Sequence, residues 1–361
     1  MNMRERVIRA LTFDPTVPPP LWHMYGLMPG TLDRWRREGL PEWVREKDIP
    51  NYFGFDPKYV SLPFPVGFNP PFQVKVLKET DRFIIKTDKM GRVTKMMKGV
   101  TTLPQAIDHP IKKPSDWRRL KERLKFSRER LREDEWTRLS EEADRKGLPV
   151  EVGCLGFFWF PRDLMGEFTL FRAYLKWPDL IHDILRTYCN LILEVSEHLL
   201  DNVRVDIFSF GEDMCYKHGP MISPRLFREF MLPYYREVLG LFRSRGTKLF
   251  LVDTDGNITK ILPLLIEAGV NVIEPLEVQA GNDIVELRRR FGDKIAFIGG
   301  IDKVALTRDI NDIEQELARK LTLMKETGGY IAGLDHRVLS ETPLRNFEYY
   351  VKRVKEILEI P

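Results

Sequence analysis

Residues 248–278 read KLFLVDTDGNITKILPLLIEAGVNVIEPLEV, and this stretch decides the fold. One apolar run ends at Asp253, a helical segment follows, and a second apolar run begins at residue 271. Gly269 stands where a helix C-terminus favours a left-handed residue. Continuous apolar runs joined by a helix are typical of buried parallel strands with a crossover connection. The stretch therefore predicts a strand-helix-strand unit of an α/β protein.

The same alternation continues on both sides of this stretch. Further apolar runs that read as strands lie at 151–158, 205–210, 295–302 and 329–336, with two more candidates at 20–25 and 58–64. Helical signals lie between them: Pro178 and a regular apolar stripe over 178–200, and the capping pair Ser223-Pro224 before a helix that Pro233 should interrupt. Eight strands alternating with helices predict a (β/α)8 TIM barrel, with residues 1–361 as one domain.

Residues 26–147 do not follow the barrel pattern. We interpret them as an N-terminal helical extension and a small β insertion. Residues 72–98 alternate polar and apolar side chains around a Met90-Gly91 turn, which predicts an antiparallel unit packed beside the barrel. Residues 112–147 read as charged helices with a solvated face.

Charge and composition exclude several classes of protein. The 57 Lys and Arg nearly balance the 53 Asp and Glu, so we expect no nucleic-acid partner. No apolar run approaches the roughly 18 residues of a membrane span, so we expect no membrane insertion. Three cysteines without a CxxC pair favour a reducing compartment, and we expect the protein to be cytoplasmic.

Polar residues at the ends of the predicted strands are the candidates for chemistry, because the carboxyl ends of barrel strands build the active site. They are Glu212, Asp213, Asp253, Asp255, Glu274, Glu277, Asp302, Asp335 and His336. A charge that follows an apolar strand is costly unless it binds a metal, a partner charge or a substrate.

Two of these candidates have a purely structural alternative. The segment DTDGN at 253–257 lacks the later ligands of a calcium loop, and Asp255-Gly256 is also a good turn. His336 is either a hydrogen-bonded core histidine or a ligand beside Asp335. Which of Asp253 and Asp255 faces the site stays open at this stage.

Aromatic residues gather at two of the predicted strand ends. Trp22, His23 and Tyr25 end the first strand, and Phe157, Phe158, Trp159 and Phe160 with Arg162 end another. Such clusters either pack the barrel or line a pocket for a flat aromatic ligand. For the second interpretation we name Trp22, His23, Tyr25, Phe158 and Arg162 as substrate-binding residues.

Five segments resemble the uroporphyrinogen decarboxylase superfamily, which includes the decarboxylase and corrinoid-dependent methyltransferases. They are RERVIRAL at 4–11, GPMISPRLFREFMLPYY at 219–235, VDTDGNITKILPLLIEAGVN at 252–271, GGIDK at 299–303 and DHRVLSETPLRNFEYYV at 335–351. The resemblance runs from residue 3 to about 357. It implies a (β/α)8 barrel.

Within this superfamily, the decarboxylase branch carries an arginine-rich signature after its first strand and an aspartate loop after its second. Here these places read WHMYGLMPG and SLPFPVGF, without the arginine or the aspartate that would serve a tetra-anionic porphyrinogen. The thiol methyltransferases have a His-x-Cys zinc pair where this chain has Asp253-Thr254-Asp255, and a late Cys near Asp335. The sulfur ligands are missing, so a zinc site would use Asp253, Glu277 and His336.

Oxygen and nitrogen ligands leave zinc a stronger Lewis acid than thiolates do, which suits a poor leaving group. The resemblance thus implies a methyltransferase that moves a methyl group from a small methoxylated, aromatic substrate to the cobalt(I) corrinoid of a partner protein. Glu212 or Asp213 would orient the substrate or assist proton transfer. The alternatives are a methylcorrinoid:thiol methyltransferase, a decarboxylase, and a non-catalytic binding module. The expected partners are a corrinoid protein and a small-molecule methyl donor, with a homodimer as one option for the oligomer.

Overall fold

A curled parallel sheet forms the centre of the molecule in the computed structural model, which describes residues 1–99 and 104–360. Its strand order is β1-β6-β7-β10-β11-β12-β13, and all neighbours are parallel. The bounds are β1 Val60–Ser61, β6 Val150–Leu155, β7 Ile207–Gly211, β10 Leu249–Asp253, β11 Val272–Glu274, β12 Ala296–Ile298 and β13 Tyr330–Ile331. Seven of the eight predicted strands are therefore confirmed.

The eighth predicted strand, at residues 20–25, is reduced to a single bridge. Leu21 pairs in parallel with Ala332 just beyond β13, and the Trp22 N–H donates to the Ala332 carbonyl over 2.9 Å. On the other side, the Asp56 N–H donates to the Leu21 carbonyl, but no ladder to β1 forms in the described residues. Prolines at 18, 19 and 20 have no N–H to donate, which explains the missing ladder. The structure shows a curled seven-stranded sheet and not a fully closed eight-stranded barrel.

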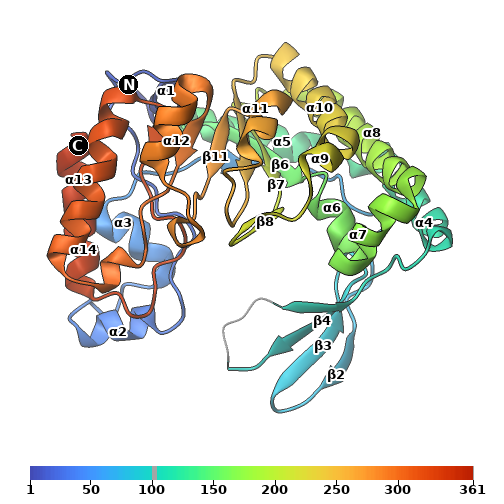
Figure 1. Ribbon diagram of the computed structural model, residues 1–361, viewed down its shortest axis with the longest axis horizontal. Helices are drawn as coiled ribbons and strands as arrows, with labels where there is room; N and C mark the ends of the chain where they lie inside the picture. Colours follow the sequence, from blue (N-terminus) through green and yellow to red (C-terminus); the bar gives the residue numbers. More distant parts are fainter. Residues whose placement is uncertain (100–103, 361) are drawn as a thin grey trace.

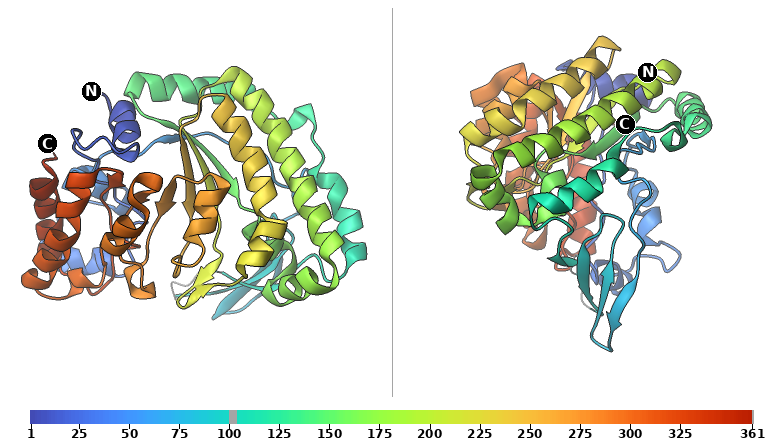
Figure 2. Two further views of the ribbon diagram at one scale, coloured as in Figure 1. Left: turned by 45° about the horizontal axis from the view of Figure 1, so that its top comes forward. Right: turned by 90° about the vertical axis from the view of Figure 1, so that its right-hand side faces the viewer.

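Helices cover the outer face of this sheet (Figure 1, Figure 2). Their bounds are α1 Met3–Leu11, α8 Pro178–Asn202, α9 Pro224–Phe230, α10 Leu232–Ser244, α11 Leu262–Ala268, α12 Ile284–Phe291, α13 Ile310–Thr327 and α14 Leu344–Leu358. Ser223 caps α9 by accepting the Leu226 N–H, as predicted, and the predicted break near Pro233 falls at Met231. None of the helices in the described part of the chain is long and apolar enough to span a membrane.

The remaining helices extend the barrel at its carboxyl end and along one side. They are α2 Thr31–Arg37, α3 Ile49–Phe53, α4 Pro114–Leu120, α5 Glu133–Lys146, α6 Trp159–Met165 and α7 Glu167–Lys176. Single 3-10 turns lie at Glu46–Asp48, Lys121–Leu124, Arg128–Arg130, Val278–Ala280, Gly292–Lys294 and Ala305–Thr307. The charged helices predicted within 112–147 are α4 and α5.

A separate antiparallel sheet confirms the predicted insertion and extends beyond it. Its order is β2-β3-β4-β5, with bounds β2 Val76–Glu79, β3 Phe83–Thr87, β4 Val93–Met97 and β5 Gln105–Asp108. The β3–β4 connection contains the predicted Met90-Gly91 turn, with Gly91 at a φ of 84°. The sheet projects from the carboxyl-end side of the barrel (Figure 1, Figure 2). A short hairpin, β8 Cys215–Tyr216 with β9 Gly219–Pro220, follows β7 at the same end.

The barrel interior changes character along the strands. Near the amino ends it is apolar, and a buried cluster there contains Trp22, Ile207, Leu249, Leu251, Val272, Ala296, Ile298 and Ile331. Glu151, inside the barrel on β6, accepts hydrogen bonds from the Ser61 and Ser209 hydroxyls. Toward the carboxyl ends carboxylates, a lysine and a tyrosine replace the apolar side chains. The fold therefore seals one end of the barrel and concentrates polar groups at the other.

Candidate active site

An inner cluster of Tyr25, Lys58, Asp253 and Glu274 lies at the carboxyl ends of β10 and β11. Asp253 and Glu274 are direct neighbours in the parallel ladder. The Tyr25 hydroxyl donates to Asp253 Oδ1 over 3.1 Å, and Lys58 Nζ donates to the Met24 carbonyl. Burial raises the pKa of both carboxyls, the charge of Asp253 raises that of Glu274 further, and Lys58 opposes the rise. When two buried carboxyls lie this near each other, the charge of one favours the protonated form of the other.

An outer cluster of Asp255, Glu277, Lys303 and His336 lies just beyond. His336 Nε2 is 3.8 Å from Asp255 Oδ2, and Lys303 Nζ is 3.9 Å from Glu277 Oε1. Burial, followed by the charge of Glu277, raises the pKa of Asp255 to about 7. Burial, followed by the charge of Lys303, lowers the pKa of His336. The cluster therefore combines an imidazole whose neutral form is favoured with a carboxyl whose protonated form is favoured by its surroundings.

The structure resolves which aspartate faces His336. Asp255 does, whereas Asp253 turns toward Tyr25 in the inner cluster. The turn that brings Asp255 there depends on Gly256, whose φ is 80° and whose N–H donates to Glu277 Oε2 over 2.9 Å. A Cβ at Gly256 would lie 2.7 Å from the backbone carbon of Cys215. The turn interpretation of DTDGN is therefore confirmed for Gly256, and Asp255 lies beside His336, while its role in a site stays a prediction.

Tyr25 joins the two clusters. Its hydroxyl binds Asp253, while its ring lies on the His336 ring with centroids 5.0 Å apart and planes 18° apart. Burial, followed by the charges of Glu274 and Asp253, raises its pKa well above the ordinary tyrosine value. Tyr25 therefore stays a protonated hydrogen-bond donor at every physiological pH.

Glu212 and Asp213, predicted as catalytic, lie at the end of β7 in different surroundings. Glu212 is fully buried and accepts the N–H groups of Phe158 and Trp159 and the Tyr235 hydroxyl, over 2.7 to 3.0 Å. Burial raises its pKa to about 7. Its oxygens are thus occupied by the first turn of α6, where a carboxylate is favoured. Asp213 is partly exposed and pairs with Arg162 over 3.0 Å.

The predicted substrate-binding residues separate into three groups. Tyr25 faces the carboxyl clusters, and Arg162 lies near them, paired with Asp213 and stacked 5.4 Å from the Trp159 ring. Trp22 and Phe158 are buried, Trp22 in the apolar barrel interior and Phe158 beneath α6. His23 packs against Phe55, and burial lowers its pKa to about 4. Trp22, His23 and Phe158 therefore support the walls of the site as placed.

The sequence analysis did not name Lys58, Lys303 and Trp159 as site residues. Lys58 lies two residues before β1, and Lys303 follows β12 in the segment GGIDK. Lys303 binds the fully buried Asp335, whose other contacts are the N–H groups of Val278 and Lys303. Each of these lysines flanks a predicted strand, and neighbouring strands of the sheet carry acidic residues. That combination is the sequence signal that would have identified both lysines. Trp159 packs over the end of β7, within 3.4 Å of where a Cβ on Gly211 would stand.

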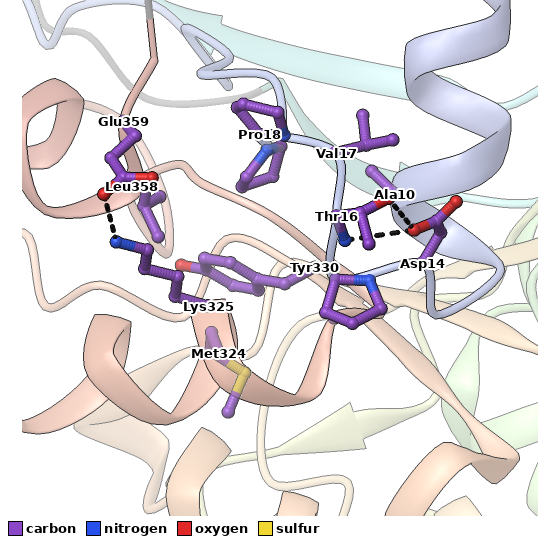
Figure 3. A pocket seen from close by; sticks show the side chains of 13 residues that line it. Ala10, Asp14, Thr16, Val17, Pro18, Met324, Lys325, Tyr330, Leu358 and Glu359 are labelled. Carbon is purple, nitrogen blue, oxygen red and sulfur yellow. Dashed lines mark hydrogen bonds and ion pairs between the residues drawn. The ribbon is translucent and has the colours of Figure 1, made fainter.

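A pocket at the opposite end of the barrel has no such chemistry (Figure 3). It lies between the residues after α1 and the helices α13 and α14, and Tyr330, the first residue of β13, is at its wall. Its charged groups are satisfied locally, by the Lys325–Glu359 ion pair and the Asp14–Thr16 hydrogen bond. The carboxyl end of the sheet therefore remains the candidate active site.

The uroporphyrinogen decarboxylase (URO-D) family model matches residues 83–357, which is most of the chain. The match includes the outer cluster and the two carboxyls of the inner cluster, while Tyr25 and Lys58 precede it. The chain belongs to the URO-D family. A uroporphyrinogen decarboxylase from Coxiella burnetii is 24% identical over 373 aligned positions, covering 97% of this chain and 94% of the relative. One from Trichodesmium erythraeum is 31% identical over 227 positions, covering 59% of this chain and 60% of the relative.

Among solved structures, a methyltransferase from Methanosarcina mazei superposes with a TM-score of 0.63 at 16% identity, covering 99% of both chains. At this identity the superposition establishes a shared fold for this URO-D family member. Its relatives are described as enzymes, either decarboxylases or a methyltransferase.

Proposed function

We propose that the protein is a methyltransferase. It would take a methyl group from a small methoxylated substrate and pass it to the cobalt(I) corrinoid of a partner protein. The substrate we propose is aromatic. The observation that carries this proposal is the excess of carboxyl groups at the mouth of the barrel. Asp213, Asp253, Asp255, Glu274 and Glu277 gather there, against Lys58, Lys303 and Arg162.

This charge pattern argues against a polyanionic substrate. A porphyrinogen with several carboxylates would meet the carboxyl groups gathered at the mouth and would need arginines to bind it. The guanidinium of Arg162 already binds Asp213, through both its side chain and its carbonyl. A neutral ether meets no such repulsion. The shared fold with the Methanosarcina mazei methyltransferase supports the same choice.

The residues can assist the departure of an ether oxygen by supplying a proton. Cleaving a methyl ether leaves negative charge on that oxygen, so a nearby acid lowers the barrier. Asp255 has a pKa of about 7 and keeps a proton on part of the molecules at neutral pH. Two aromatic rings lie near these carboxyl groups: Tyr25, stacked on His336, and Trp159, which has Arg162 over its ring. In the proposal, the corrinoid supplies the nucleophile that accepts the methyl group.

The side chains as placed do not form the zinc site that the sequence predicts. Across residues 1–99 and 104–360, no group of three or more His, Cys, Asp and Glu side chains is arranged to hold a metal ion. His336 Nδ1 accepts the Arg337 N–H over 2.8 Å, so the neutral ring carries its proton on Nε2, which faces Asp255. Metal-binding histidines use the opposite arrangement and donate their second N–H. Zinc binding by Asp253, Glu277 and His336 stays a prediction, and no step above depends on it.

Methyl transfer to free cob(I)alamin tests the proposal directly. Purified protein is mixed with cob(I)alamin and a panel of methoxy-arenes, and methylcobalamin is followed by its absorption spectrum. We expect turnover by the wild type and a loss of about 10²-fold or more in Asp255→Asn. Asp293→Asn, exposed in the 3-10 turn before β12, is the matched control and should keep full activity. Release of CO₂ from uroporphyrinogen without methyl transfer would favour the decarboxylase instead.

A further inference from the structure

Helix α7 carries an apolar stripe that the barrel does not cover. Its inner face is buried through Leu170, Ala173 and Tyr174. Its outer face presents Phe168, Phe171 and Leu175, whose exposed fractions are 83%, 36% and 73%. A surface helix of a globular protein normally shows a polar outer face, and contiguous exposed apolar side chains mark interaction sites. We call Phe168, Phe171 and Leu175 the α7 stripe.

The α7 stripe is physically connected to the candidate active site. The Phe171 ring lies 6.4 Å from that of Phe158, whose N–H is bound by Glu212 at the end of β7. The preceding helix α6 also carries Arg162, which pairs with Asp213. Helix α7 lies at the carboxyl end of the sheet, on the same side of the molecule as β8 and the insertion (Figure 1, Figure 2). A molecule on the stripe would therefore sit beside the mouth.

The neighbouring insertion adds a second exposed surface with a strong positive charge. Residues 75–98 contain eight Lys and Arg against three Asp and Glu. Every residue of the edge strand β2 is exposed, with Val76 at 59% and Leu77 at 55%. The insertion is tied to α6 because Arg92 forms a 2.5 Å ion pair with Asp163, and His109 Nδ1 lies 3.0 Å from the Asp163 carbonyl. The insertion therefore contacts α6, the helix that directly precedes α7 and its stripe.

We propose that the α7 stripe and strand β2 dock an acidic protein with an apolar patch, which brings the methyl acceptor to the mouth. This inference rests on the proposed function, because a protein-borne acceptor must reach the site. Positive charge around exposed apolar groups favours rapid encounter with an acidic partner. Exposed Lys75 and Lys78 flank Val76 and Leu77, so the charges border the apolar side chains directly.

The size and charge of the surface favour this occupant over a second copy of the chain. A ten-residue helix spans about 15 Å, and three side chains fall short of the roughly 1,200 Å² that a stable interface buries. A symmetric contact through the stripe would also bring two basic insertions toward each other, which costs energy. A small surface suits a partner that binds and leaves in every reaction cycle.

Methyl transfer measured with two different acceptors distinguishes an effect on partner docking from an effect on the reaction itself. The first is free cob(I)alamin, and the second is cob(I)alamin bound to a purified acidic corrinoid protein from the same cells. The variants are Phe168→Ser with Leu175→Ser, and Lys75→Glu with Lys78→Glu, all at exposed positions. Trp43→Ser, exposed between α2 and α3 across the barrel, is the matched control. We expect the KM for the protein-borne acceptor to rise about tenfold in both double variants, with kcat and the rate with free cob(I)alamin unchanged.

Every other outcome overturns the inference in a recognisable way. An unchanged KM in the double variants means that the partner docks elsewhere. Sedimentation as a dimer that the Phe168→Ser and Leu175→Ser variant dissociates assigns the stripe to a second copy. Salt-sensitive binding to phosphatidylserine vesicles, lost in the same variant, assigns it to a lipid surface. Absence of methyl transfer to both acceptors in the wild type rejects the proposed function itself, and this inference with it.

Discussion

Tyr25 and His336 lie ring on ring, with centroids 5.0 Å apart, although 311 positions separate them in the sequence. The stack fixes the Tyr25 hydroxyl against Asp253 and the His336 Nε2 against Asp255. One aromatic pair thus sets the geometry of both carboxyl clusters.

Tyr25→Phe should move the acidic limb of the activity profile to higher pH. The Tyr25 hydrogen bond lowers the pKa of Asp253, so its loss raises that pKa. The stack on His336 remains, because phenylalanine keeps the ring. A pH series of methyl transfer rates measures the shift. Tyr52→Phe, on α3, should leave the profile unchanged; an unshifted profile in Tyr25→Phe would show that Asp253 does not titrate in the reaction.

Glu274→Gln should stabilise the protein above neutral pH. The folded-state pKa of Glu274 is raised, so the unfolded chain ionises first and stability falls as pH rises from about 4.5 toward 8. A neutral glutamine removes that loss, worth about 3 to 5 kcal/mol at pH 8 and nothing at pH 4. Thermal unfolding at both pH values checks the sign. Equal melting temperatures for wild type and variant at pH 8 would contradict the raised pKa.

Glu212→Ala should destabilise the fold by about 3 to 5 kcal/mol, because it leaves the Phe158 and Trp159 N–H groups and the Tyr235 hydroxyl without an acceptor. Tyr235→Phe removes one donor and should cost only about 1 kcal/mol. Denaturant unfolding gives both values, and hydrogen exchange should show faster opening of α6. Full stability of Glu212→Ala together with lost activity would instead restore the catalytic role that the sequence suggested.

Metal content tests the zinc prediction independently of activity. Elemental analysis of protein purified without added metal should compare the wild type with His336→Ala, Glu277→Gln and Asp253→Asn. About one zinc per chain, lost in the variants, would mean that the His336 ring turns to offer a deprotonated nitrogen. Equally little zinc in the wild type and in the variants would contradict the zinc prediction and would leave the His336 proton facing Asp255.

Much of the fold could be predicted from local pattern. Apolar runs separated by amphipathic helices identified β1, β6, β7, β10, β11, β12 and β13, since buried parallel strands are continuous and apolar. The segment at 20–25 looked equally apolar, but prolines 18 to 20 deprive it of ladder donors. The apolar pattern of a strand does not show how many backbone N–H groups are available for a ladder. For that reason the sequence predicted a closed barrel.

The site could be predicted only as a location. Strand ends pointed to Asp253, Asp255, Glu274 and His336, and these side chains lie near one another because the fold brings carboxyl ends together. The direction of each side chain depended on turns and partners distant in sequence. Gly256 turns Asp255 outward, Tyr25 draws Asp253 inward, and the start of α6 occupies Glu212. These side-chain directions depend on contacts between residues that are distant in the sequence, so no local sequence pattern predicts them.

The bridge between Leu21 and Ala332 can form only after the chain has been synthesised as far as residue 332. A chain leaves the ribosome N-terminus first, so Leu21 emerges long before the strand it pairs with exists. The proline segment before it has little hydrogen-bonding capacity to offer any other strand in the meantime. Its weakness as a strand thus protects the nascent chain from false pairing. The Leu21–Ala332 bridge and the stack of Tyr25 on His336 can therefore form only after the chain has been synthesised past residue 336.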